Sequence, residues 1–128
     1  MVDIHTHIIP EFDDGARNLD DSIAMAESES KAGTSVILAT PHVQNSRDID
    51  KSPTIVEKVA SLNVEFAKRN IAVKVLPGAE LFPCEAVLRG LENGLPITLG
   101  GTGKYVLLDL PHSALPLNFD TILFEIQA

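Results

Sequence analysis

The chain has 128 residues, and its acidic side chains outnumber the basic ones to give a formal net charge of −8. A negative surface repels phosphate backbones, and aromatic residues make up only 5% of the chain, which argues against nucleic-acid binding. The single cysteine, Cys84, can form neither an internal disulfide nor a multi-cysteine zinc site. This composition favours a globular domain in a reducing compartment.

The first residues contain neither a basic segment nor a long apolar run, so we expect no signal peptide. No stretch of about 18 or more apolar residues is present, so we expect no membrane insertion. The sequence therefore predicts a cytoplasmic protein.

Four short apolar runs divide the chain and alternate with helical patterns. The runs are rich in Val, Ile and Leu, which is typical of parallel strands that are buried on both faces. They are Met1–Ile4, Ser35–Ala39, Ile71–Leu76 and Tyr105–Leu108. We predict one strand for each run.

The first two helices are predicted from capping residues and apolar spacing. Asp20 or Asp21 is expected to cap a first helix that stops at Gly33. Pro53 suits the first turn of a second helix, and Asn70 can take the left-handed position at its end. One face of this second helix carries an apolar stripe, which consists of Ile55, Val59, Leu62 and Phe66.

Two further helices complete the pattern. Pro83 is expected to open a third helix that closes near Gly94, and a fourth runs from about Asn118. The alternation predicts a single α/β domain over residues 1–128 with parallel strands. A sheet of this kind has two unpaired edges, through which copies of the chain could associate into a homo-oligomer. The other arrangement is the first part of a longer barrel, which the chemistry of the residues after the strands favours.

Each predicted strand is followed by a histidine or a carboxylate. His5 and His7 follow the first strand, His42 the second, Glu80 the third and Asp109 the fourth. The carboxyl ends of parallel strands meet at one edge of a sheet, where α/β proteins bind their ligands. Each residue alone also has an ordinary structural explanation, such as a cap or a buried ion pair. Their joint placement favours a shared site.

The residue types in this pattern indicate a metal site. His5 and His7 are two apart, so along an extended strand end both imidazoles project to the same side. Two imidazoles can share an ion, and carboxylates from other strands can complete the ligand set. Gly15 permits a tight turn that could swing Asp14 inward.

Other motifs are weaker. The segment 100–104 resembles a phosphate loop, but it lacks the Walker spacing and precedes a strand. Cys84 and Arg89 are one residue too close for the loop of a cysteine phosphatase, so an inert thiol is expected. Arg17 is expected to be solvated, and His112 either contacts a substrate or lies in a surface loop.

Five motifs, taken together and in this order, resemble those of the PHP superfamily of metallohydrolases. They are Asp3-Ile4-His5-Thr6-His7-Ile8-Ile9-Pro10, Asp13-Asp14-Gly15-Ala16-Arg17, Ala39-Thr40-Pro41-His42, Pro77-Gly78-Ala79-Glu80-Leu81 and Tyr105-Val106-Leu107-Leu108-Asp109-Leu110-Pro111. The chain most closely resembles the bacterial manganese-dependent tyrosine phosphatases of capsule and exopolysaccharide operons. The resemblance covers nearly the whole chain.

This resemblance implies a distorted (β/α)7 barrel, of which the chain would supply the first four βα units. It implies two or three metal ions, Mn²⁺ in the family, with iron or zinc as alternatives. The implied ligands are His5, His7, Asp14, His42, Glu80 and Asp109. Glu80 would bridge two ions, and His42 and Glu80 would be essential for catalysis. The family more often has Glu at the position of Asp109.

The family continues into a His-Pro-Glu motif, an Asp-x-His pair and phosphate-binding arginines, which these 128 residues do not contain. The domain is therefore expected to be incomplete at its C-terminus. The resemblance implies metal-assisted hydrolysis of phosphotyrosine, with a bacterial tyrosine kinase that governs polysaccharide export as the partner protein. The alternatives are another PHP phosphoesterase, such as a histidinol-phosphate phosphatase, or an inactive metal-binding fragment.

Overall fold

A computed structural model describes all 128 residues of the chain. Six short strands alternate with five α-helices and one 3-10 turn, η1 (Leu99–Gly101). The strands are β1 (Val2–Thr6), β2 (Val36–Ala39), β3 (His42–Val43), β4 (Lys74–Pro77), β5 (Glu80–Leu81) and β6 (Leu107–Leu108). The helices are α1 (Leu19–Lys31), α2 (Ser46–Lys51), α3 (Thr54–Lys68), α4 (Glu85–Glu92) and α5 (Phe119–Gln127).

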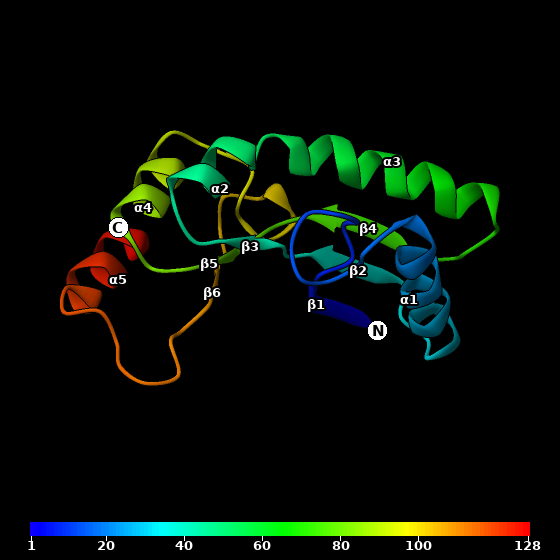
Figure 1. The fold of residues 1–128 in the computed structure, drawn as a ribbon, viewed down its shortest axis with the longest axis horizontal. Helices are drawn as coiled ribbons and strands as arrows, with labels where there is room; N and C mark the ends of the chain where they lie inside the picture. Colours follow the sequence, from blue (N-terminus) through cyan, green and yellow to red (C-terminus); the bar gives the residue numbers. More distant parts are fainter.

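The strands form two parallel sheets, in the orders β1-β2-β4 and β3-β5-β6 (Figure 1). The chain runs from β2 into β3, and from β4 into β5, with two residues between the strands in each case. β2 and β4 are neighbours in the first sheet, and β3 and β5 are therefore neighbours in the second. The edge strands, which pair on one side only, are β1 and β4 in the first sheet and β3 and β6 in the second. The predicted α/β fold with parallel strands is confirmed, and the sheets do not close into a barrel.

The second and third predicted strands end at Ala39 and within one residue of Leu76, as expected, but the two short strands that follow them, β3 and β5, were not predicted. Strand pairing stops after Ala39 and after Pro77 and then resumes at His42 and Glu80. Pro41 has no N–H to donate, although its carbonyl accepts the Glu80 N–H at 2.9 Å. These breaks place His42 and Glu80 opposite one another in a second sheet, where they are partners in register.

The start of α1 corrects a second expectation. The cap is Asn18, whose side-chain oxygen accepts the Asp21 N–H at 2.9 Å, rather than Asp20 or Asp21. The two aspartates lie in the first turn, where their charge favours the positive end of the helix. The short helix α2 was not predicted, because its six residues include only one apolar side chain, Ile49, and so show no apolar periodicity.

The long helix α3 lies along the first sheet and closes the core on that side (Figure 1). Its predicted stripe is buried and joins one apolar cluster with side chains of β2 and β4, including Ile37 and Val75. Asn70 has a φ of 55°, which confirms its predicted left-handed conformation. No helix combines the length and apolar character needed to cross a bilayer.

Candidate metal centre

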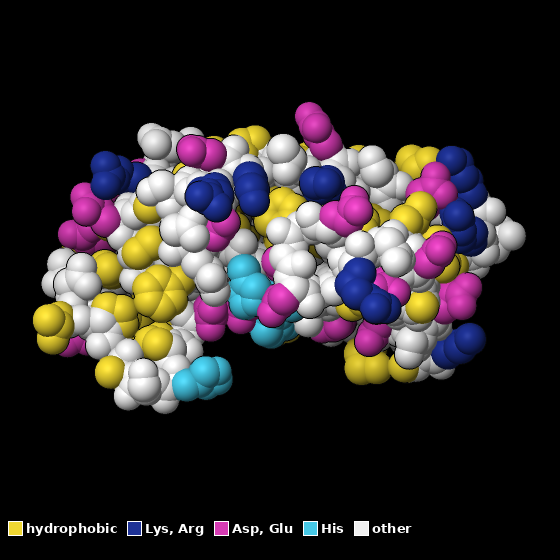
Figure 2. All heavy atoms as spheres, in the orientation of Figure 1, with side chains coloured by type: hydrophobic (Ala, Val, Ile, Leu, Met, Phe, Trp, Pro, Cys, Tyr) yellow, Lys and Arg dark blue, Asp and Glu magenta, His cyan; other side chains and the backbone are white.

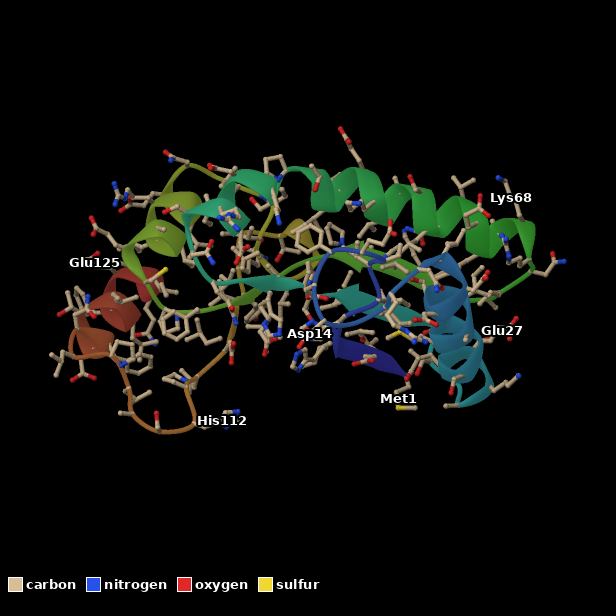
Figure 3. All side chains as sticks on the ribbon, viewed as in Figure 1. Met1, Asp14, Glu27, Lys68, His112 and Glu125 are labelled. Atoms are coloured by element: carbon tan, nitrogen blue, oxygen red, sulfur yellow. The ribbon has the colours of Figure 1, made fainter.

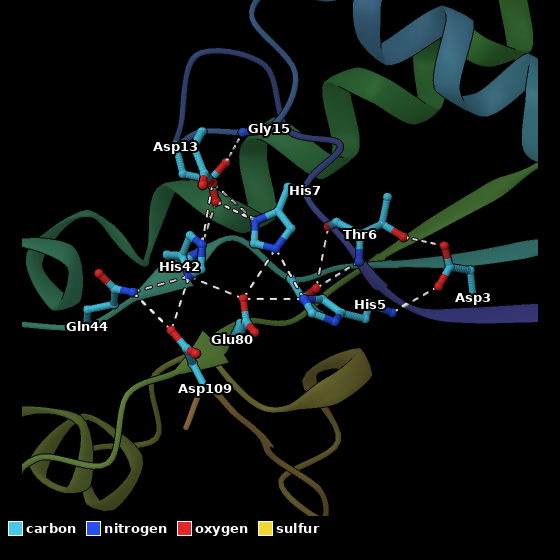
Figure 4. A network of polar contacts seen from close by, with 12 residues as sticks. Asp3, His5, Thr6, His7, Asp13, Gly15, His42, Gln44, Glu80 and Asp109 are labelled. Carbon is cyan, nitrogen blue, oxygen red and sulfur yellow. Dashed lines mark hydrogen bonds and ion pairs between the residues drawn. The ribbon is translucent and has the colours of Figure 1, made fainter. Parts of the chain in front are cut away.

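The side chains of His5 and His7 lie on the same side of the chain at the end of β1, as their spacing predicted. Their Nε2 atoms are 3.2 Å apart (Figure 4). Thr6, between them, is buried and points away, and its N–H donates to Thr40 Oγ1 at 2.9 Å. The local strand geometry therefore aims both imidazoles at one place.

Asp13 holds His7 in a defined tautomer. Its Oδ2 accepts His7 Nδ1–H at 2.8 Å and the His42 backbone N–H at 2.9 Å, while Oδ1 accepts the Gly15 N–H at 3.0 Å. Burial by itself raises the pKa of Asp13, but these hydrogen bonds outweigh it and keep the pKa below the ordinary value. With Nδ1–H engaged, the lone pair of His7 Nε2 faces the other site residues.

Asp14, rather than Asp13, was the predicted site residue of this turn. The Asp14 side chain is 81% exposed, and its Oδ1 lies 3.4 Å from His42 Nε2. Asp14 is therefore at the open mouth of the site, while Asp13 is the carboxylate that turns inward. Gly15 does not have a positive φ. It is required because a Cβ at this position would overlap the carbonyl oxygen and Cβ of His7.

Glu80 lies at the centre of the three imidazoles. Its Oε2 is 3.3 Å from His5 Nε2, 3.2 Å from His7 Nε2 and 3.2 Å from His42 Nδ1. None of these contacts is aligned as a hydrogen bond, so Oε2 is the only buried side-chain nitrogen or oxygen without a hydrogen-bond partner. An unpaired buried carboxylate oxygen is costly, so this position is explained best by a bound cation.

Asp109 completes the arrangement from the end of β6. Its Oδ2 lies 3.7 Å from His42 Nδ1 and accepts Gln44 Nε2–H at 3.1 Å. Sequence reasoning did not find Gln44, which lies 3.4 Å from His42 Nδ1. Its position two residues after His42 along an extended segment was the available signal, since period two places both side chains on one face.

Three groups of side chains bring potential ligand atoms within 4.8 Å of one another. They are His7, Asp13, Asp14 and His42; His5, His7 and Glu80; and His42, Glu80 and Asp109. Two ligand atoms that are each about 2.1 Å from an ion lie about 3.0–3.4 Å apart at octahedral to tetrahedral angles. The nitrogen and oxygen atoms around Glu80 Oε2 meet this requirement at 3.2–3.3 Å. The residues therefore fit a metal ion.

The site is strongly acidic. The carboxylates of Asp13, Asp14, Glu80 and Asp109 lie within 4.0 Å of histidine nitrogens, but none of them pairs with a Lys or Arg. In the space-filling view, histidine side chains and carboxylates gather at a notch in the middle of the molecule (Figure 2). Without bound cations, this concentration of negative charge would repel an anionic ligand.

The other candidates lie outside these groups. Arg17 pairs with Asp21, with Nε 2.7 Å from Oδ2, and is 83% exposed, which confirms the predicted solvated side chain. Cys84 Sγ–H donates only to the Gln44 carbonyl, at 3.7 Å. Figure 3 shows His112 on the exposed loop after β6, apart from Asp14. The segment 100–104 forms a turn before β6 and opens no helix.

Comparison with known proteins identifies relatives over most of the chain. The model of the CpsB/CapC family, described as capsular polysaccharide synthesis, matches residues 1–123. Tyrosine-protein phosphatase YwqE of Bacillus subtilis (strain 168) is 34% identical over 127 residues, which are 99% of this chain and 50% of YwqE. Tyrosine-protein phosphatase CpsB of Streptococcus agalactiae is 28% identical over 109 residues, which are 85% of this chain and 44% of CpsB.

The fold also matches a solved structure. It comes from a study of YwqE from Bacillus subtilis and CpsB from Streptococcus pneumoniae, described as unique metal-dependent tyrosine phosphatases. The TM-score is 0.87 at 33% sequence identity, and the match covers 99% of this chain and 51% of the other. The chain thus spans about half the length of the curated relatives it matches.

Proposed function

This chain belongs to the CpsB/CapC family of capsular polysaccharide synthesis, and from that premise we propose that it carries the metal-binding part of a phosphatase that hydrolyses phosphotyrosine in proteins. The observation that carries the proposal is the unpaired Glu80 Oε2, surrounded by three imidazole nitrogens. The names of the relatives support the reaction class.

We propose two ions that share Glu80. One would be held by His5, His7 and Glu80, and the other by His42, Glu80 and Asp109. A neutral imidazole has only one nitrogen lone pair for a metal, so His42 can serve one ion and not two. His7 can also bind only one ion. Because its Nδ1–H donates to Asp13, it would bind the first ion through Nε2.

Asp14 would serve a third ion at the exposed mouth, which its 81% exposure permits. Bound divalent cations would polarise the phosphoryl oxygens and make a water molecule more acidic. The residues of this chain orient the centre: Asp13 fixes the His7 ring, and Gln44 Nε2–H fixes one oxygen of Asp109. The acidic site would accept a phosphate dianion only once these cations offset its charge.

The finer features of the proposal rest on the family resemblance. They are Mn²⁺ as the metal, a bacterial tyrosine kinase as the substrate protein and a location in the cytoplasm. We also propose that the two sheets belong to a PHP-type barrel, of which residues 1–128 would form the first four βα units. The parallel strands and the open edges of both sheets support this arrangement.

Metal dependence and substrate choice can be tested together. Phosphate release from a phosphotyrosyl peptide is expected with Mn²⁺ and is expected to stop on addition of a chelator. Cys84→Ser should release phosphate at the wild-type rate, because Cys84 lies outside all three ligand groups. Faster release from histidinol phosphate would support the other phosphoesterase. Mn²⁺ binding without release from either ester would support an inactive metal-binding fragment.

Asp13→Asn is expected to weaken Mn²⁺ binding by about 10- to 100-fold, the usual effect of losing a carboxylate that orients a ligand histidine. The neutral amide accepts a weaker hydrogen bond from His7 Nδ1–H and leaves the ring less firmly held. Calorimetric titration of the metal measures the effect. Asp50→Asn, at an exposed position on α2, is the control. Equal affinities of the two variants would show that Asp13 does not orient His7.

A further inference from the structure

A pocket of about 460 Å³ lies beside the metal centre, at the carboxyl ends of β3, β5 and β6. The residues that line this pocket directly follow the three strands of one sheet. The lining consists of Gln44, Asn45, Phe82, Asp109, Leu110, Pro111 and His112. The carboxyl ends of parallel strands are where α/β proteins bind ligands, and the volume is within the range of small-molecule sites.

The pocket and the metal centre share a wall. Asp109 belongs to one of the ligand groups and also lines the pocket. Gln44 lines the pocket and contacts both Asp109 Oδ2, at 3.1 Å, and His42 Nδ1, at 3.4 Å. A molecule with a phosphate at the metal centre would therefore extend its ester group into this pocket.

The chemistry of the lining favours an uncharged apolar group. Phe82, Leu110 and Pro111 supply apolar surface, and Leu110 is 47% exposed. No Lys or Arg lines the pocket. The polar groups are largely engaged, since Gln44 Nε2–H donates to Asp109 and Asn45 Oδ1 accepts the Asp48 N–H at 3.1 Å. Figure 2 shows hydrophobic side chains gathered near this region, over α5 and the segment after β6.

We propose that this pocket receives the aromatic ring of an aryl phosphate ester, with Phe82 and Leu110 as specificity-determining residues. An aromatic ring beside Phe82 gains edge-to-face or offset stacking, which an aliphatic ester cannot provide. The inference rests on the proposed phosphatase function and deepens it, since it assigns this chain's preference for an aryl over an alkyl ester to these two side chains.

The test compares binding of O-phosphotyrosine and O-phosphoserine to the ¹⁵N-labelled chain loaded with Zn²⁺, a diamagnetic ion that suits imidazole ligands, followed by NMR. The wild-type chain is expected to bind phosphotyrosine about tenfold more tightly than phosphoserine, which is the usual size of the effect of an apolar pocket contact. Phosphotyrosine alone should shift the amide signals of Phe82, Leu110 and His112. Leu110→Ser should weaken phosphotyrosine binding more than phosphoserine binding, and so reduce the preference. Leu117→Ser is the matched control, because Leu117 is fully exposed and outside the pocket.

The outcomes separate this inference from the function on which it depends. Equal binding of both amino acids by the wild-type chain, or an unchanged preference in Leu110→Ser, would overturn the ring-binding pocket and leave the metal centre in place. If neither phosphoamino acid binds, the phosphatase proposal is overturned, and the ring-binding pocket with it. A folded Leu110→Ser variant, verified by its amide spectrum, makes these comparisons valid.

Discussion

Glu80→Gln is expected to lower the affinity for Mn²⁺ by more than about 100-fold, beyond the effect of losing a group that merely orients a ligand. Glu80 is the one carboxylate common to both proposed ion sites, so its replacement by a neutral amide weakens both at once. Isothermal titration of the metal-free chain with Mn²⁺ measures the affinity. Metal-dependent phosphate release should be lost with it.

Two controls make the Glu80 result specific. Glu57→Gln removes the same charge from an exposed position on α3 and should bind Mn²⁺ like the wild type. Without metal, Glu80→Gln should melt at or above the wild-type temperature, because it removes an unpaired buried charge. Unchanged Mn²⁺ affinity in Glu80→Gln would show that the two ions do not share this residue.

Gly15→Ala is expected to damage both folding and metal binding. The added Cβ would overlap the backbone and Cβ of His7, so the turn or the histidine must move. Overpacking of this kind costs about 1–3 kcal/mol in the free energy of unfolding, which corresponds to a fall in Tm of about 3–15 °C. Displacement of His7 should also weaken Mn²⁺ binding. Thermal melts with and without metal measure both effects.

Gly103→Ala separates steric overlap from backbone strain. Gly103 has a φ of +71° and no neighbouring atom within 4 Å of the position of a Cβ. Its substitution should therefore cost only about 1 kcal/mol of backbone strain, with Mn²⁺ affinity unchanged. If Gly15→Ala bound metal as tightly as Gly103→Ala, the close approach to His7 would not matter for the site.

The fold was predictable where the signal is local. The stripe of Ile55, Val59, Leu62 and Phe66 follows from helical spacing alone, and all four side chains are buried. Strand lengths were less predictable: pairing begins only at Lys74 in the third run and at Leu107 in the fourth. Apolar composition identifies a buried segment, but pairing depends on a neighbouring strand that lies far away in sequence.

The site was predictable for residues that follow strands and less so for the turn. His5, His7, His42, Glu80 and Asp109 all converge, because parallel strands bring their carboxyl ends together. The choice between Asp13 and Asp14 could not be made from the sequence. Asp13 turns inward because the backbone N–H of His42, 29 residues away, donates to it. That partner exists only after folding.

The hydrogen bonds of Asp13 also bear on the thermodynamics of cation uptake. By holding the His7 ring and the His42 backbone together, this carboxylate assembles much of the donor set before an ion arrives. Metal sites that form only on folding use part of their binding free energy to order the polypeptide. Here the polypeptide around the site has already lost most of its conformational entropy when the two sheets fold, before an ion binds. Cation uptake should therefore proceed with a small heat-capacity change, as expected for a receptor that is preorganised.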